Sequence, residues 1–454
     1  MTVAGVALLR QRNVVPGWAV LAACAGAVIV SLGVAVAATS WPLLLLPGIL
    51  IAAVIVVSVL RLDLAVLLLA AAIPLEYSVS LASVPQLTVV KLAGGLCFAA
   101  FIVQLAWRRM RFRLDVTHVL LLAILGCILV ATVAAQSLDS ALLVTVRYVS
   151  YVGIYFVITA FAGDYRTLER VVWVLSIACA VAGLLAIHNL LTGFATRATP
   201  TYGDANDLAY ILSTTLPLTL WLLRRRGPRR LAVLALIAVI GVADALTFSR
   251  GAAVGLGCAV LWVLFTQRRQ VRAALGPLAI VAVAIGVVGL TQQARLSTAF
   301  TVKSAAAASN VTHRFDAWRS AVELIVAHPL VGVGPGNFQY FTAAVDDRPP
   351  TNADPTVVHN TYLDIGAEVG LPALVLLLAY VVTVFKRLRV ATQGRRGPPS
   401  MAIAVTAAMI VAVAAGLTLS EQYYAPLWLM GALATCLWQG KRSTSAVATG
   451  GGAR

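Results

Sequence analysis

Charged residues are scarce in this sequence. Asp, Glu, Lys and Arg make up 11% of the 454 residues, whereas hydrophobic residues make up 61% and the mean hydropathy is +0.93. A soluble chain carries about a quarter of charged residues. The apolar residues form runs of the length that crosses a bilayer, about 20 residues. This composition excludes a cytosolic enzyme and a disordered scaffold, and it predicts a polytopic membrane protein.

Several familiar signals are missing as well. The six cysteines all lie in apolar runs and show no metal-ligand spacing, and we find no Walker loop, zinc motif or dinucleotide fingerprint. The first apolar run, 18–38, is too long for a cleavable signal peptide and lacks a small-residue cleavage site. We therefore expect no metal and no other cofactor.

The apolar runs predict an all-α fold, a polytopic transmembrane helical bundle of twelve to fourteen spans. The third, sixth and last runs are short, which leaves the count open. The fourteen runs lie near 18–38, 42–60, 62–75, 87–106, 116–135, 148–162, 171–191, 207–223, 231–247, 252–266, 275–291, 361–385, 401–419 and 425–440.

Basic residues concentrate in every second loop, as at 224–230, 268–272 and 386–396. The positive-inside rule makes this side cytoplasmic and places both termini there, in a cytoplasmic (inner) membrane. The net charge of +17 is then a topology signal, so we expect membrane lipids and no nucleic acid as partners.

Four regions follow from this topology. Residues 1–291 hold spans one to eleven, 292–360 form a long extracytoplasmic loop, 361–442 hold spans twelve to fourteen, and the Ser/Thr/Gly/Ala-rich 443–454 form a disordered cytoplasmic tail. A long loop in a compact bundle is usually functional.

Within the loop, 311–327 has the periodicity of an amphipathic helix that ends before Pro329. Its predicted apolar face carries Phe315, Trp318, Ala321, Val322 and Ile325, and the opposite face carries Asp316, Ser320 and Glu323. Arg319 is spaced for a surface ion pair with Glu323. Arg314 falls inside the apolar face without an acid at helical spacing, so it either meets an anion from elsewhere or extends to a headgroup.

Two motifs follow the helix. Gly334 and Gly336 in the Gly-rich stretch 331–338 allow close approach to a ligand, or a tight turn back into the bundle. His359 and Asn360 then precede a helix whose N-terminus suits phosphate, although a single histidine is more often structural. Thr361 and Asp364 fit a capping box. Tyr362 and Glu368 lie in the same helix, and 370–372 predicts a kink.

Two further outer turns are polar. In 201–207, Asn206 or Asp207 is expected to cap the next helix. Arg250 occupies a tight corner in 248–251, where it serves either as an interfacial anchor or as an anion ligand.

These motifs, in this order, resemble the bacterial O-antigen ligase and O-antigen polymerase superfamily. The matching stretches are 202–209, 248–251, Arg314 with Trp318 and 328–338, 359–363 with Glu368, and 370–372. The resemblance implies a GT-C-like fold and an inverting, metal-independent glycosyltransferase. Such an enzyme passes a glycan from an undecaprenyl-diphosphate donor to a lipid, glycan or protein acceptor at the outer face. By motif, Arg250, Arg314 and His359 carry over as functional residues.

The chemistry fits these residue types. Imidazole accepts the acceptor's hydroxyl proton near neutral pH, and guanidinium binds the departing diphosphate with a two-pronged fork. We therefore expect His359 as base, with Glu368 or Asp364 as alternatives, and Arg250 and Arg314 as diphosphate ligands. Asn206, Asn360, Tyr362, Glu368, Gly334 and Gly336 are the further predicted substrate contacts. The competing hypotheses are a repeat-unit polymerase of the same superfamily, a lipid-linked oligosaccharide flippase or transporter, and a non-catalytic assembly component.

Overall fold

The structure is a computed structural model, and it describes residues 54–76, 89–107, 112, 114–161, 163–201, 203–293, 297, 307–342, 356–393 and 400–450. No strand occurs among these residues, and the predicted all-α fold is confirmed. The first half contains α4 (Leu62–Ala72), η3 (Ile73–Leu75), α5 (Val89–Ala106), α6 (Val116–Val133), α7 (Leu138–Thr159), α8 (Tyr165–Leu191) and α9 (Ala205–Leu222). The second half contains α10 (Pro228–Leu246), α11 (Arg250–Thr266), α12 (Arg268–Thr291), α14 (Ala307–Ala327), η4 (Phe338–Phe341), α15 (Thr361–Glu368), α16 (Leu371–Thr392), α17 (Met401–Ala415) and α18 (Ala425–Gly450).

Five of the described helices are long and apolar enough to cross a membrane: α5, α6, α7, α8 and α16. Helix α11, helix α17 and the α4–η3 segment are shorter apolar helices of the same character. The protein is therefore a multi-pass membrane protein. The first predicted span and most of the second, 18–38 and 42–60, lie outside the described residues.

Several boundaries differ from those expected from the sequence, and three of the differences have a local cause. The run 361–385 forms two helices, α15 and α16, because Gly370 adopts a left-handed φ of 95° and ends the first. Helix α7 begins at Leu138, ten residues before the predicted span, because Ser137 caps it. Helix α18 extends to Gly450, through most of the expected disordered tail 443–454, since alanine, serine and threonine tolerate extension of an existing helix.

The chain divides into two compact units. The first comprises 1–66 and 95–113, where the Gln104 amide donates to the carbonyl oxygens of Val59, at 2.8 Å, and Leu60. The second comprises 67–94 and 114–454 and contains all the candidate site residues.

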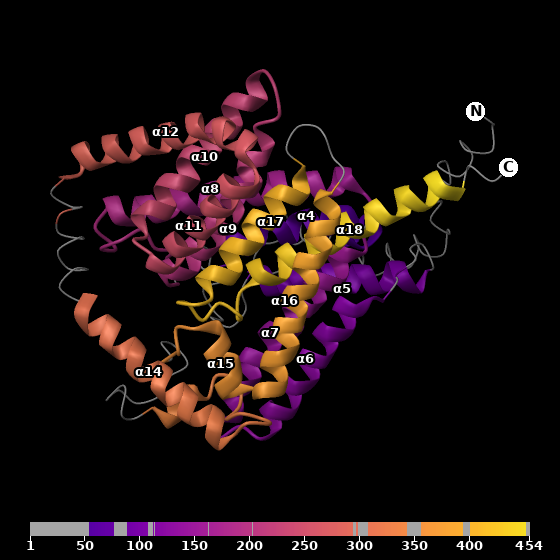
Figure 1. The fold of residues 1–454 in the computed structure, drawn as a ribbon, viewed down its shortest axis with the longest axis vertical. Coiled ribbons are helices and arrows are strands. Elements are labelled where there is room, and N and C mark those ends of the chain that lie inside the picture. Colours follow the sequence, from indigo (N-terminus) through magenta and orange to yellow (C-terminus); the bar gives the residue numbers. More distant parts are fainter. Residues whose placement is uncertain are drawn as a thin grey trace, which may run out of the picture. The chain divides into compact units, whose positions relative to one another are not determined.

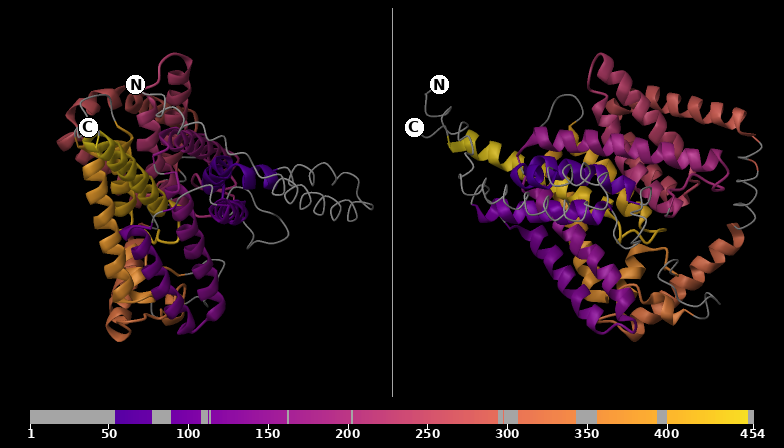
Figure 2. Two further views of the ribbon diagram at one scale, coloured as in Figure 1. Left: turned by 90° about the vertical axis from the view of Figure 1, so that its right-hand side faces the viewer. Right: turned by 180° about the vertical axis from the view of Figure 1, so that it is seen from behind.

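In the second unit, α9 packs against α8, α10 and α17, while α11 packs against α17. Helix α16 packs between α6 and α18, and the α6–α7 hairpin runs alongside it (Figures 1 and 2). Small residues permit these close approaches: a Cβ on Gly255 of α11 would lie 2.7 Å from the carbonyl oxygen of Val411 in α17. Helix α14 packs against the short α15, near one end of α6, α7 and α16 (Figure 1).

Candidate functional site: two arginines and a neutral histidine

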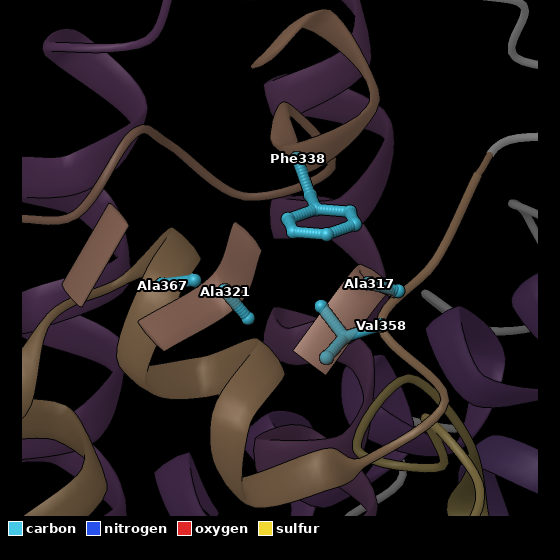
Figure 3. Packing of buried hydrophobic residues seen from close by; sticks show 5 residues of the cluster. All are labelled: Ala317, Ala321, Phe338, Val358 and Ala367. Atoms are coloured by element: carbon cyan, nitrogen blue, oxygen red, sulfur yellow. The ribbon is translucent and has the colours of Figure 1, made fainter. Parts of the chain in front are cut away.

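A small apolar core holds α14 against α15. Ala317 and Ala321 of α14 meet Ala367 of α15, with Phe338 and Val358 completing the cluster (Figure 3). All five side chains are buried, and the alanines let the two helices approach closely. This core sets the rotation of α14 and therefore decides where its arginines point.

The predicted inward face of α14 is confirmed in part. Trp318 and Ile325 pack against the core, as the helical periodicity predicted. Phe315 and Val322 do not: their exposed fractions are 60% and 48%. The prediction for these two residues is wrong because α14 contacts α15 through a narrow stripe centred on alanines, which leaves one edge of its apolar face uncovered.

Arg314 lies on the packed side of α14 and is half-buried. Its Nη1 donates a hydrogen bond of 3.0 Å to the backbone carbonyl of Thr418, in the turn between α17 and α18. Burial lowers the pKa of this guanidinium, the positive charge of Arg250 lowers it further, and Asp204 acts in the opposite direction. Arg314 still remains charged at neutral pH. It therefore lies within electrostatic reach of a second arginine from another helix.

Arg319 contrasts with Arg314. Its Nε lies 3.2 Å from Oε1 of Glu323, and the two side chains are 83% and 66% exposed. The predicted surface ion pair is confirmed, so Arg319 is a surface residue with its own counter-ion.

Arg250 is the first residue of α11, because Ser249 caps that helix by accepting from the Ala252 backbone N–H. Its side chain is exposed. Among the described residues, no hydrogen bond or ion pair of this side chain is present. Within the described part of the chain, its guanidinium therefore has no counter-ion.

The α9 N-terminus supplies an acid to the same region. Asp204, rather than the predicted Asn206 or Asp207, caps α9: it accepts from the backbone N–H of Asn206 at 2.5 Å. Arg197 also donates to its carboxylate, at 3.0 Å. The prediction missed the cap because 201–207 offers several polar side chains, and only the residue just before Ala205 has the required extended backbone. Asn206 itself is half-buried at this turn.

His359 is held in an unusual backbone conformation, with a φ of 57°. Such a conformation costs a non-glycine residue of order 1 kcal/mol and persists only when its surroundings enforce it. Burial and, to a smaller extent, the positive charge of Arg314 lower the pKa of this imidazole to about 4, against the opposing effect of Asp204. The ring is therefore neutral at pH 7 and able to accept a proton. No hydrogen bond to the ring occurs among the described residues.

The residues after His359 are fixed by the protein. Asn360 is the N-cap of α15 and accepts from the backbone N–H groups of Tyr362 and Leu363, while its Nδ2 donates to the carbonyl of Leu417 at 3.1 Å. The predicted capping box on Thr361 is therefore wrong by one residue. Thr361 is instead bound by the α17–α18 turn, where its Oγ1 donates to the carbonyl of Leu419 at 2.9 Å.

Tyr362 faces the same part of the bundle. Its hydroxyl donates to the carbonyl of Val413 in α17 at 2.8 Å. Together with Asn360 and Thr361, it docks the start of α15 onto the end of α17. This docking places His359 beside the α17–α18 turn that also holds Arg314.

Glu368, Gly334 and Gly336 form a separate cluster at the other end of α15. The Glu368 carboxylate accepts from the backbone N–H groups of Gly336, at 2.7 Å, and Phe338, at 3.1 Å, and from the hydroxyl of Tyr423. Both glycines have left-handed φ values, 99° and 69°. The structure does not bring this cluster to Arg250, Arg314 and His359 through any described contact.

The two glycines approach protein atoms. A Cβ on Gly334 would lie 2.4 Å from that of Ala135, and one on Gly336 would lie 2.9 Å from Val144. Of the two interpretations of the Gly-rich stretch, these contacts match a tight turn that re-enters the bundle between α15 and the α6–α7 hairpin.

Glu421 is a site residue that sequence reasoning missed. It lies in the α17–α18 turn, its side chain is 3% exposed, and its backbone N–H donates to Oγ1 of Thr361 at 2.9 Å. Its Oε2 has no hydrogen-bond partner among the described residues. Burial raises its carboxyl pKa well above the usual value, and the negative charges of Asp207 and Asp204 raise it further. The polar run 420–422 between two apolar spans was the signal available in the sequence.

The arrangement combines two chemical abilities. Two guanidinium groups within mutual electrostatic reach favour a ligand with more than one negative charge, such as a diphosphate. The neutral imidazole of His359 accepts a proton beside them. The described residues contain no group of three or more His, Cys, Asp or Glu side chains placed to hold a metal ion.

The comparisons with known proteins bear on this region of the chain. A search of the curated proteins found no match. Residues 235–378 match the family described as O-antigen ligase, and the matched segment contains Arg250, Arg314, the Gly-rich turn, His359 and Glu368. Over this part of the chain, the protein is similar to the O-antigen ligase family.

Proposed function

We propose that this membrane protein of polysaccharide biosynthesis transfers a glycan from an undecaprenyl-diphosphate donor to a hydroxyl group of an acceptor. The observation that carries the proposal is that Arg314 lies within electrostatic reach of both Arg250 and His359. The α17–α18 turn also bonds both Arg314 and Asn360, the residue after His359. Neither arginine forms an ion pair with an acid among the described residues, and a neutral base lies near Arg314; this arrangement matches the requirements of diphosphate departure and hydroxyl attack.

In the proposed reaction, the acceptor oxygen attacks C1 of the donor sugar while its proton moves to an imidazole nitrogen of His359. The bond between C1 and the diphosphate oxygen breaks, and the electron pair stays with the undecaprenyl diphosphate. Arg250 and Arg314 stabilise the negative charge that develops on this leaving group. Direct attack inverts the anomeric centre. The proton later passes from His359 to water.

The other predicted contacts have supporting parts in this proposal. Asn360 and Tyr362 orient the backbone that carries His359, through the bonds to Leu417 and Val413. Asn206 lies at the α9 N-terminus beside Asp204 and is available to a sugar hydroxyl. Glu368 and the two glycines hold the shape of the loop, and its carboxylate oxygens are already engaged by Gly336 and Phe338.

The decisive experiment is in vitro transfer. The purified protein in proteoliposomes would receive a radiolabelled glycan on undecaprenyl diphosphate together with lipid, glycan or protein acceptors. We expect labelled product from the unaltered protein, and a roughly 10²–10⁴-fold slower rate from His359→Ala with donor binding retained. A flippase would move the donor across the bilayer without forming product. The acceptor that is used distinguishes a ligase from a polymerase.

Metal independence is tested in the same assay. Because the arginines take the charge-neutralising part, activity should persist in excess EDTA. Loss of activity that magnesium or manganese restores would remove Arg250 and Arg314 from their proposed role.

The proposed face of the membrane has its own test. A reporter fused near Ala343 should behave as exported, since the basic loops 268–272 and 386–396 on either side are expected in the cytoplasm. A cytoplasmic signal from this fusion would overturn the proposed location of the site.

A further inference from the structure

Helix α14 exposes a line of large apolar side chains. Phe315, Val322 and Val326 are 60%, 48% and 76% exposed, and their spacing of seven and four residues puts them on one face. Leu330, just beyond the helix, is 73% exposed and extends the line. Single exposed apolar residues are ordinary, but a contiguous row of this kind marks a surface that contacts lipid or protein.

This line is continuous with a lipid-facing stripe on α16. That helix is long and apolar enough to span a membrane, and it exposes Leu371, Val375, Leu378 and Val382 at helical spacing, each by 40% to 62%. The backbone N–H of Leu371 donates to the carbonyl of Pro329 at 2.8 Å. The end of the α14 line therefore meets the beginning of the α16 stripe.

A second apolar edge lies on the other side of the Gly-rich turn. Val133 and Leu138, at the α6–α7 turn, are 86% and 54% exposed. This turn is joined to the Gly-rich stretch, because the backbone N–H of Ser137 donates to Oδ1 of Asn337 at 2.6 Å. The exposed apolar residues at the turn between two candidate spans, α6 and α7, thus lie next to the Gly-rich stretch that follows α14.

The remaining sides of α14 carry different residues. Asp316, Arg319 and Glu323 are exposed and polar, whereas Ala317 and Ala321 are buried against α15. Arg319 lies between Phe315 and Val322 along the exposed apolar line, and its guanidinium pairs with Glu323 beside that line. The helix therefore has a protein-facing side and an exposed side on which an apolar line borders charged residues. A helix lying in the boundary between headgroups and acyl chains has this distribution.

We propose that α14 docks in the bilayer leaflet at its end of the bundle. Phe315, Val322, Val326 and Leu330 enter the acyl region, and Arg319, at the edge of this line, directs its guanidinium to Glu323 at the level of the headgroups. Lipid is the occupant because the line continues a surface that already faces lipid on α16. The docked helix would hold Arg314, on its protein-facing side, at the depth of the headgroups. This docking does not depend on glycan transfer.

Spin labels test the proposal. Single cysteines at 322 and 326, and at 316 and 323 as matched controls on the charged side, are introduced into a chain without its native cysteines. Leu378→Cys on α16 serves as the lipid reference. The labelled proteins are placed in phosphatidylethanolamine–phosphatidylglycerol vesicles, and collisions with oxygen and with a water-soluble nickel chelate are measured. We expect the ratio of oxygen to nickel collisions at 322 and 326 to match that at 378 and to exceed that at 316 and 323 several-fold.

Two outcomes would overturn the docking. Labels at 322 and 326 that resemble those at 316 and 323 would place this face in water. Labels shielded from both reagents would mean that a second copy or another protein covers it. The unaltered protein provides a second measurement that needs no substitution: lipids with a photoreactive group on the acyl chain should form adducts within 315–330. Absence of adducts there, with adducts present on α16, would equally refute the proposal.

Discussion

Arg387 is buried and Arg314 is half-buried, and the two arginines have different surroundings. Arg387, on α16, is 5% exposed, and its Nη1 donates to Asp115, Thr117 and Thr435 at 2.9–3.0 Å. Its guanidinium also lies 4.3 Å from the ring centroid of Trp438. Arg314 donates to the Thr418 carbonyl, which carries no net charge, and lies near the like charge of Arg250.

The anionic partner shows the same difference. Asp115, the partner of Arg387, is also bonded to His118, at 2.9 Å, and to the amide of Gln439, at 2.9 Å. Burial alone would raise the pKa of this carboxyl, but the hydrogen bonds from His118, Arg387 and Thr117 hold it well below its usual range. A structural arginine such as Arg387 therefore has an anionic partner that the protein itself supplies. At a binding site, the ligand supplies the anionic partner of the arginine. Arg314 has the surroundings expected of such an arginine.

Removal of Arg387 should give the largest effect, and it should be an effect on stability. Arg387→Met would leave the half-buried Asp115 carboxylate without its guanidinium partner. Breaking a fully buried ion pair costs about 3–5 kcal/mol, so we expect a loss near or below the lower end of that range. Equilibrium unfolding in mixed micelles measures this. The double variant with Asp115→Asn should recover part of the loss, because the uncompensated charge is gone. If Arg387→Met has the same free energy of unfolding as the unaltered protein, Arg387 is not a structural arginine and the contrast with Arg314 is wrong.

Arg314→Lys should affect catalysis and leave the fold intact. Lysine keeps the charge but loses the two-pronged fork, so we expect glycan transfer to fall about 10²–10³-fold, the loss typical of one charge-stabilising donor. The free energy of unfolding should change by less than ~1 kcal/mol, because the guanidinium bonds to a single carbonyl. A variant that unfolds readily but transfers normally would make Arg314 a second structural arginine.

The pH profile sharpens the same comparison. His359 works in its neutral form, so activity is present above its pKa and is lost as the pH falls through it. For the free enzyme, burial and Arg314 place the pKa at about 4, and kcat/KM should fall near that pH. Bound diphosphate favours the imidazolium, so the kcat limb should lie at higher pH. Arg314→Gln removes a neighbouring positive charge and should move the kcat/KM limb upward. If the limb does not move, the charge of Arg314 does not act on His359.

Arg319→Lys should give the smallest effect. The exposed pair with Glu323 contributes about 0–1 kcal/mol, so both stability and transfer should stay close to those of the unaltered protein. The variant is the matched control for Arg314→Lys, since both residues lie on α14. If Arg319→Lys is the more harmful of the two, the inward-facing arginine has been misassigned.

Periodicity predicted much of this region but not its finest details. It placed Arg314, Trp318 and Ile325 on the packed side of α14, and the structure agrees. It also put Phe315 and Val322 there, because a helical wheel shows which residues are apolar but not how wide the contact with the neighbouring helix is. The width depends on α15, whose packing against α14 no local pattern encodes.

Caps and contacts show the same limit. The sequence offered Thr361, Asn206 and Asp207 as caps, whereas Asn360 and Asp204 have the extended backbone that capping requires. Thr361 was unavailable because Leu419 and Glu421, some sixty residues away, engage its hydroxyl. The Glu421 carboxylate was overlooked because only the folded α17–α18 turn brings it near Asp204 and Asp207.

By itself, the sequence determined the class of the protein. Long apolar runs cannot leave a bilayer without exposing their side chains to water, so an all-α membrane bundle follows from composition and run length. The family motifs likewise nominated Arg250, Arg314 and His359. Only the tertiary structure decided which polar groups have partners. Arg387 meets Asp115 across more than 250 residues, Glu368 binds the Gly-rich turn, and Arg314 meets a carbonyl beside another arginine. Such pairings depend on helix packing between distant segments, because electrostatic and hydrogen-bonding forces act over a few ångströms in space, whatever the separation along the chain.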